Sequence, residues 1–184
     1  LLTLVLLQSC QDTITSENVI DYGIVINEIN YNSSDDFDPG DWIEIYNNTN
    51  DSINIGTWLL KDENDDNVLV LPENTVAFPD QYIVFCKDTT KFSQFFPDVN
   101  FFKNELSFGL SGGKDDVRLF DSNGILADIV QYSDDYPWPS NADGEGQTLE
   151  LKHPDLDNAN WENWAPSIGF GTPGSLNSSF TGEY

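Results

Sequence analysis

Residues 27–47 read NEINYNSSDDFDPGDWIEIYN, and this stretch predicts two neighbouring strands joined by an acidic loop. In its second half, Ile43 and Ile45 are expected on one face of a strand, with Trp42, Glu44 and Tyr46 on the other. A period of two residues is typical of a strand with two different faces. The stretch therefore favours an antiparallel β-structure.

The segment IVINEINY at residues 24–31 has the same period. Simple alternation places Val25 and Ile29 on one face and Glu28 on the opposite face with Ile26. Glu28 and its counterpart in the next strand, Glu44, therefore each lie beside apolar neighbours. We expect both carboxylates to accept hydrogen bonds and to brace the sheet, with no catalytic role. A pair of carboxylates flanking a metal-binding loop is the alternative.

The rest of the chain consists of short apolar segments separated by Asn, Asp, Gly and Pro. Further strands are expected at residues 41–47, 53–61, 68–71, 81–86, 116–120, 125–132 and 147–151. Turns are expected at DSNG (121–124) and DGEG (143–146), and only residues 89–96 have a helical spacing, over one or two turns. Without long amphipathic helices a parallel doubly wound sheet is not expected, and an all-β antiparallel sandwich or barrel is favoured.

Composition limits the classes of partner. The 184 residues carry 32 acidic and 7 basic side chains, for a net charge of −25. Such a surface repels nucleic acid phosphates and anionic membranes, so nucleic acid is not an expected partner. The aromatic content, with 5 Trp, 7 Tyr and 12 Phe, can supply the core of one globular domain.

The amino-terminal residues LLTLVLLQSC resemble the end of a bacterial lipoprotein signal peptide. On that interpretation residues 1–9 are a signal peptide remnant, Cys10 carries the lipid and residues 10–23 form a tether. An ordinary secretory signal that happens to contain a cysteine is the alternative. Cys86, the other cysteine, is expected to be a small buried residue and not a nucleophile.

Two acidic loops are candidate calcium sites, because Ca²⁺ prefers oxygen ligands. The candidate ligands are Asp35, Asp36, Asp38 and Asp41 in the first loop, and Asp62, Asn64 and Asp66 in the second. The second loop has the spacing of an EF-hand loop, but strand-like segments flank it where an EF-hand has helices. A solvated loop and a polar hairpin tip are the alternatives, and no other cofactor is expected.

GLSGG at residues 109–113 fits the pattern of a nucleophilic serine at Ser111, with His153 downstream. That motif requires a helix after the serine. Here a turn and a strand are expected, so we interpret the pattern as a turn and expect no catalytic residue.

Several pieces of the chain, in order, resemble the bacterial form of the lamin tail domain. They are VINEINYN, DWIEIYNNTNDSINIGTWLLKD, LPENTVAFPDQYIVFC, LSGGKDDVRLFDSNGILADIVQY, YPWPSNADGEGQTLELKHPDLDNANWENW and GTPGSLN. The resemblance covers residues 24–177, which leaves residues 178–184 as a tail or linker. It implies an immunoglobulin-like β-sandwich. The tryptophans expected to be structural are Trp42, Trp58, Trp138, Trp161 and Trp164.

The resemblance also guides the functional expectation, since bacterial lamin tail domains are secreted or surface modules to which no catalytic residues are attributed. We expect a non-catalytic module, lipid-anchored at the bacterial outer membrane or cell surface, or otherwise secreted, that binds a protein or a polysaccharide. The alternative is an accessory domain of a larger secreted hydrolase whose catalytic part lies beyond residue 184. The DNA binding of animal nuclear lamins is not expected, because this chain lacks a basic surface.

Overall fold

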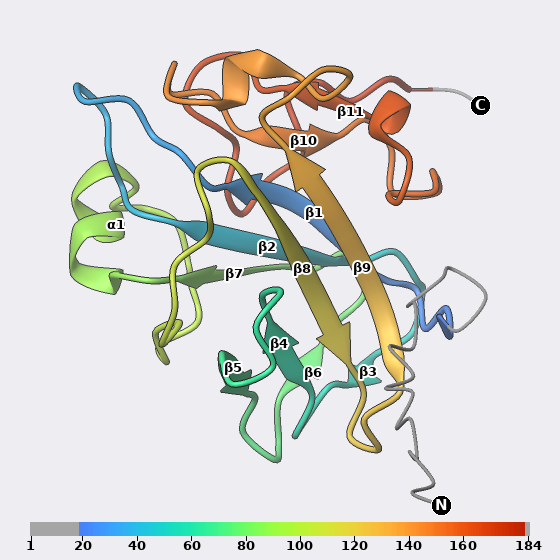
Figure 1. Cartoon of the computed structure of the whole chain (residues 1–184). Coiled ribbons are helices and arrows are strands. Elements are labelled where there is room, and N and C mark those ends of the chain that lie inside the picture. Colours follow the sequence, from blue (N-terminus) through green and yellow to red (C-terminus); the bar gives the residue numbers. More distant parts are fainter. Residues whose placement is uncertain (1–18, 183–184) are drawn as a thin grey trace, which may run out of the picture.

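In the computed structural model, which describes residues 19–182, short antiparallel strands predominate and helix is scarce (Figure 1). The strands are β1 (Ile24–Asn30), β2 (Trp42–Asn47), β3 (Ile53–Asn54), β4 (Leu59–Lys61), β5 (Val68–Val70), β6 (Val76–Ala77), β7 (Tyr82–Cys86), β8 (Lys114–Phe120), β9 (Leu126–Ser133), β10 (Leu149–Leu151) and β11 (Trp164–Pro166). The helical elements are α1 (Thr89–Phe95) and the single 3₁₀ turns η2 (Ser140–Ala142) and η3 (Trp161–Asn163).

The strands form two main sheets that enclose one core. The larger sheet has the order β11-β10-β1-β2-β7 and the other has the order β5-β4-β8-β9, while β3 and β6 form a small third pair. All of these strand pairs are antiparallel. The expected all-β, immunoglobulin-like antiparallel sandwich is therefore confirmed.

Alternating apolar residues of both sheets meet in this core. Ile43 and Ile45 of β2 are buried in it, as their spacing predicts, together with Leu60 of β4 and Val117 and Leu119 of β8. Burial of such side chains contributes about 1.5–3 kcal/mol each relative to exposure. One face of the larger sheet therefore packs in the core, and its opposite face packs against other segments.

Helix α1 covers part of that opposite face, beside the ends of β2 and β7 (Figure 1). Its Phe92 packs with Trp42, Val84 and Cys86 in a second buried cluster. Asp88 caps the helix by accepting a hydrogen bond from the backbone N–H of Lys91 at 2.7 Å. The predicted helical turns are thus confirmed. Within residues 19–182 no helix is long and apolar enough to cross a membrane.

One predicted strand is interrupted. Residues 53–61 were expected to be continuous, but a turn separates β3 from β4. Thr57 has a φ of 61°, and the backbone N–H of Trp58 donates to the carbonyl of Ile55 at 3.2 Å. Gly56 lies so close to the backbone of Glu73 in the same chain that a Cβ at position 56 would be 2.0 Å from the Glu73 carbonyl oxygen. This tertiary approach selects the turn.

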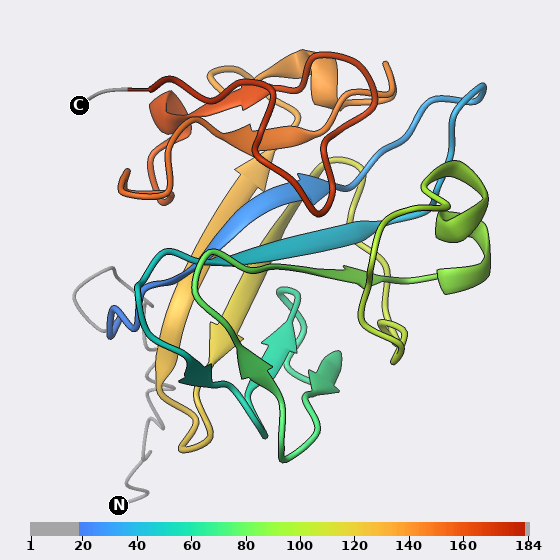
Figure 2. The ribbon, with the colours of Figure 1, turned by 180° about the vertical axis from the view of Figure 1, so that it is seen from behind.

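The carboxy-terminal residues return across the larger sheet. After β11, residues 167–182, here called the C-terminal segment, pass over the end of β1, as the red loop in Figure 2 shows. The segment is fixed to the sandwich at its far end, where the N–H of Thr181 donates to the carbonyl of Lys152 at 3.0 Å. Residues 178–181, expected to belong to a tail or linker, therefore contact the domain.

Candidate functional site

Three glutamates lie next to one another on three neighbouring strands of the larger sheet. Glu28 of β1 pairs in register with Glu44 of β2 on one side and with Glu150 of β10 on the other. All three residues have 0% of their surface exposed. Like charges opposite each other in a sheet repel, and a buried carboxylate loses its hydration. This glutamate row, Glu28, Glu44 and Glu150, therefore requires hydrogen-bond donors from the protein.

A β-bulge in β1 determines which side chains reach the row. The pairing of β1 with β2 shifts between Ile26 and Glu28, so Asn27 is the extra residue. Ile26 consequently lies in the core with Ile29, and the expectation that it shares a face with Glu28 is wrong. Asn27 instead donates to Oε1 of Glu44 at 2.8 Å. Simple alternation fails here because one inserted residue reverses the face of every residue beyond it.

The C-terminal segment supplies donors to Glu28 and Glu150. The backbone N–H of Thr172 donates to Oε1 of Glu28 at 3.0 Å. The hydroxyl of the same threonine lies 3.4 Å from Oε2 of Glu28 and 2.8 Å from Oε1 of Glu150. Glu150 also accepts from the hydroxyl of Ser178 at 2.9 Å and from the N–H of Ser179 at 2.7 Å. Residues 172–179 are thereby fastened to two strands at once.

The remaining oxygens of the row are occupied as well. Oε2 of Glu44 accepts from the backbone N–H of Gly174 at 2.6 Å, and the hydroxyl of Thr148 donates to Oε1 of Glu28 at 2.5 Å. All six carboxylate oxygens of the row thus accept at least one hydrogen bond. The carboxylate oxygens of the row are therefore all hydrogen-bonded to other groups of the protein.

Close packing at Gly171 seals this arrangement. Its φ is 92°, a conformation that favours glycine. A Cβ at this position would lie 2.8 Å from Oε1 of Glu28 and 2.9 Å from the methyl group of Thr148. The missing side chain therefore allows the C-terminal segment to lie directly on the row.

Burial shifts the protonation equilibria of the row. Loss of hydration raises the pKa of Glu28 well above its ordinary range, and the neighbouring carboxylates Glu44 and Glu150 raise it further. Burial also raises the pKa of Glu44 to about 8, although the hydrogen bonds from Gly174 and Asn27 oppose the shift. The row therefore favours at least partial protonation near neutral pH, which relieves the repulsion between its members.

The geometry does not provide an acid/base pair open to a substrate. General acid–base chemistry requires a carboxyl group within hydrogen-bond reach of the reacting atom. Glu28 and Glu44, the pair expected from the sequence, do lie together, but beneath the C-terminal segment. Sequence reasoning missed the third member, Glu150. Its surroundings, LEL at residues 149–151, repeat the pattern of a single glutamate between apolar residues in a strand, and that pattern is the signal that could have found it.

The first candidate calcium loop does not assemble a ligand set. Asp35 and Asp36 are exposed. Asp38 forms an ion pair with Lys91 at 2.5 Å, and this bond lowers the pKa of Asp38. Asp41 accepts from the backbone N–H of Leu110 at 2.9 Å. The last two carboxylates are therefore engaged by donors within the protein.

The second candidate loop is the tip of the β4–β5 hairpin, as expected from its turn-forming residues. Asp62 accepts from the N–H of Asn64 at 2.7 Å, and Asn64 accepts from the N–H of Asp66 at 3.1 Å. Arg118 reaches this tip, where its guanidinium donates to the carbonyl of Asp62 and pairs with Asp65 at 3.1 Å. A protein cation thus already lies at the tip. Across residues 19–182 no three His, Cys, Asp or Glu side chains form a group that could hold a metal ion.

The other residues considered from the sequence lie apart from the row. Ser111 lies in the turn before strand β8, without the helix that a nucleophilic serine requires. His153 pairs with Asp155 at 3.7 Å and stacks on Phe180. Cys86 is a buried free thiol whose pKa is raised to about 12, chiefly by burial. Cys10, the expected lipidation site, lies outside the described residues.

Four of the five tryptophans pack inside the protein. Trp42, Trp58 and Trp164 are at most 4% exposed, and Trp138 packs against the core at its edge. Trp161 differs, because 40% of it is exposed, and it lies in η3 with its ring centroid 6.5 Å from that of Tyr136. The expectation of a packing role is therefore wrong for Trp161, which belongs to the surface.

Comparison with protein-family models gives a match over residues 22–134 to the model described as Lamin Tail Domain. This match spans 113 residues, more than half of the 184. It includes Glu28 and Glu44 but ends before Glu150 and the C-terminal segment that covers the row. A search among curated proteins finds no match.

Proposed function

The chain belongs to the lamin tail domain family, and from that premise we propose that it is a non-catalytic, lipid-anchored cell-surface module that binds a protein or polysaccharide partner. The family consists of non-catalytic, immunoglobulin-like domains. Its fold positions binding surfaces without dictating a ligand, so the proposal rests on the residues themselves.

One observation carries the non-catalytic part of the proposal. The glutamate row is the only place among residues 19–182 where three carboxylates lie in register on adjacent strands, and all its oxygens accept internal hydrogen bonds. A glycoside hydrolase requires two carboxyl groups that face the scissile bond. Carboxylates turned inward support a bracing role, in agreement with a module that binds and does not catalyse.

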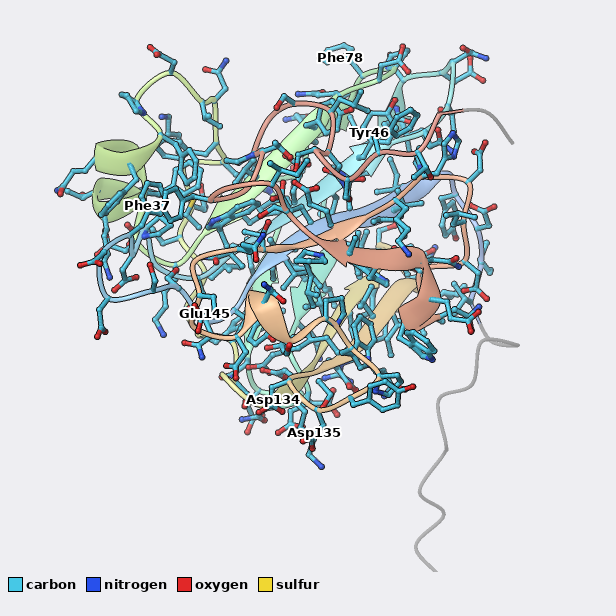
Figure 3. All side chains as sticks on the ribbon, turned by 90° about the horizontal axis from the view of Figure 1, so that it is seen from above. Phe37, Tyr46, Phe78, Asp134, Asp135 and Glu145 are labelled. Carbon is cyan, nitrogen blue, oxygen red and sulfur yellow. The ribbon has the colours of Figure 1, made fainter. Side chains whose placement is uncertain are left out.

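Exposed aromatic side chains support a binding role. Tyr136 is 92% exposed and belongs to a loop that also carries Asp134 and Asp135. Its ring lies beside that of Trp161 in η3. Figure 3 shows these two aspartates projecting from one edge of the molecule. Aromatic faces stack on apolar surfaces of partners, and carboxylates accept hydrogen bonds from hydroxyl groups. The pair Tyr136 and Trp161 therefore offers a contact for either class of partner.

The anchor is tested by metabolic labelling. The full gene is expressed in a bacterial host supplied with an alkyne fatty acid, and labelled protein is followed through membrane fractionation. We expect label and membrane attachment in the natural chain and loss of both in Cys10→Ala. Labelling that persists in Cys10→Ala would contradict the anchor.

The binding role is tested separately on the intact chain. Retention on immobilised cell-surface polysaccharide and cross-linking to surface proteins are compared between the natural chain and the double variant Tyr136→Ala/Trp161→Ala. Reduced retention or cross-linking in the variant is expected. Reading the complete open reading frame decides the alternative of a larger secreted hydrolase, because a catalytic domain encoded after residue 184 would establish it.

A further inference from the structure

A pocket of about 230 Å³ lies between the outer face of the larger sheet and the C-terminal segment. Two aromatic pairs line it. Tyr46 and Tyr82 come from β2 and β7, whereas His153 follows β10 and Phe180 belongs to the C-terminal segment. Leu176, 56% exposed, contributes an apolar wall. Figure 3 shows Tyr46 on the side of the molecule opposite Asp134 and Asp135, so this pocket is separate from the exposed Tyr136 loop.

The rings of each pair lie close together. The ring centroids of Tyr46 and Tyr82 are 4.6 Å apart, and those of His153 and Phe180 are 5.0 Å apart in a stacked arrangement. The faces of tyrosine and phenylalanine rings carry partial negative charge and attract cations that approach within about 6 Å of the ring centre. Walls of this kind favour a cation with an apolar stem over a neutral polar ligand.

Two carboxylates accept hydrogen bonds from residues of the pocket lining. Asp80 accepts from the Tyr46 hydroxyl at 3.0 Å, and Asp155 accepts from Asn48, a residue of the pocket lining, at 2.5 Å. Burial first, and then Asp80, Tyr82 and Asp155, raise the pKa of Tyr46 to about 12. The hydroxyl group thus lies in a negative local field. The net charge of −25 adds a long-range attraction for basic partners.

The basic side chains next to the pocket have partners of their own. His153, which lines the pocket, pairs with Asp155 at 3.7 Å. The amino group of Lys152, next in the chain to the lining residue Leu151, donates to the carbonyl of Glu162 at 2.6 Å. It is thereby directed toward η3. A cation that enters the pocket therefore meets aromatic faces, behind which Asp80 and Asp155 accept hydrogen bonds from Tyr46 and Asn48.

We propose that this pocket binds a lysine side chain presented by a partner protein. The inference rests on the proposed binding role and specifies the chemistry of the partner. Its volume is below the roughly 300–1,000 Å³ of sites for drug-sized ligands, which suits one long side chain better than a series of sugar rings. The aliphatic stem packs beside Leu176, and the ammonium group lies over the rings of Tyr46 and Tyr82.

The test is a titration of the isotope-labelled full chain with a short, end-capped peptide containing one lysine, followed by NMR. A peptide with the same sequence and an Nε-acetylated lysine is the matched neutral probe. We expect the ring signals of Tyr82 and Phe180 to shift with the lysine peptide, and binding to weaken at least five-fold after acetylation. Equal binding of both peptides would overturn the proposal.

Variants locate the binding. Tyr82→Leu keeps apolar bulk but removes the aromatic face, and should weaken binding about five-fold, whereas Tyr82→Phe should bind like the natural chain. Asp80→Asn removes one charge while keeping a residue that tolerates the φ of 57° found there, and should weaken binding about two-fold. Asp80→Asn alone tests the pocket assignment if Tyr82→Leu does not fold. Tyr136→Leu, in the separate loop, is the control with no expected effect.

Failure of this inference is distinguishable from failure of the proposed function. Lysine binding that is unchanged in both Tyr82→Leu and Asp80→Asn would overturn the pocket assignment, yet retention through Tyr136 and Trp161 would leave the binding module intact. A neutral oligosaccharide that shifts the Tyr82 signals, where the lysine peptide does not, would also overturn the inference and identify a polysaccharide site.

Discussion

Glu28 and Glu150 lie directly opposite each other on adjacent strands, and the hydroxyl of Thr172 lies between their carboxylates at 3.4 and 2.8 Å. One hydroxyl proton can serve only one of the two oxygens at a time. Protonation of Glu28, whose pKa is raised by burial and by its neighbouring carboxylates, relieves the repulsion within the pair. The hydrogen bonds that hold the C-terminal segment therefore depend on the protonation state of Glu28.

Thr172→Val should destabilise the protein by about 1–3 kcal/mol, because it removes a hydroxyl that donates to buried carboxylates and leaves Glu150 Oε1 with the Ser178 hydroxyl as its remaining donor. The free energy of unfolding in urea at neutral pH measures the effect. Thr90→Val, at an exposed position of α1, is the matched control and should change stability by less than about 0.5 kcal/mol. Equal effects of the two substitutions would contradict a role for the Thr172 hydroxyl.

Stability should fall as the pH rises from about 4.5 to about 8. The pKa of Glu44 is raised from an ordinary value of 4.5 to about 8, so between these values the folded protein retains a proton that the unfolded chain releases. Each such proton gives a slope of about −1.4 kcal/mol per pH unit within this window. Glu28, and Asp128 with its pKa of about 6, change stability in the same direction.

Glu44→Gln isolates the contribution of that residue. The amide cannot lose a proton, so the variant should lose up to about 1.4 kcal/mol per pH unit of slope. Its NH2 group cannot accept the hydrogen bond of Asn27 or Gly174, so the variant should also be less stable than the natural chain at low pH. Urea unfolding from pH 4.5 to 9 at constant ionic strength measures both slopes. Glu145→Gln, on the exposed residue labelled in Figure 3, corrects for general acidic repulsion. Parallel curves for the natural chain and Glu44→Gln would refute the assignment.

Two glycines of the C-terminal segment separate backbone strain from contact with the row. Gly169 and Gly171 have φ values of 86° and 92°, so alanine is strained at either position, by about 1–3 kcal/mol. A Cβ at Gly169 has nothing within 4 Å, whereas at Gly171 it meets Glu28 at 2.8 Å. Gly171→Ala should therefore be more destabilising than Gly169→Ala by at least about 1 kcal/mol in thermal or urea unfolding. Similar losses for both would show that the contact is easily relieved.

Calcium should have little effect on stability. In the two candidate loops Asp38 is paired with Lys91, and Arg118 donates to the carbonyl of Asp62. Preferential binding to the folded state would raise the melting temperature. We expect the melting temperature to change by less than about 1 °C between millimolar calcium and chelator. A larger, saturable rise would establish a calcium site that the protein assembles with other ligands.

The periodicity of single strands was sufficient to predict the fold class and the burial of Ile43 and Ile45. It failed at Ile26, because the bulge at Asn27 depends on pairing with β2 and not on the local pattern. It also missed β6 (Val76–Ala77) and β11 (Trp164–Pro166). Trp161 shows a further limit, since large apolar residues also occur on surfaces.

The sequence by itself determined an acidic all-β domain of the lamin tail family, because alternation, turn residues and ordered motifs are local properties. Only the tertiary structure placed Glu150 beside Glu28 and brought the C-terminal segment over them. Glu28 is 122 positions from Glu150 and 144 positions from Thr172, and their contacts depend on strand order and register. The aromatic pocket has the same origin, since Tyr82 and Phe180 meet only after the chain has returned across the sheet.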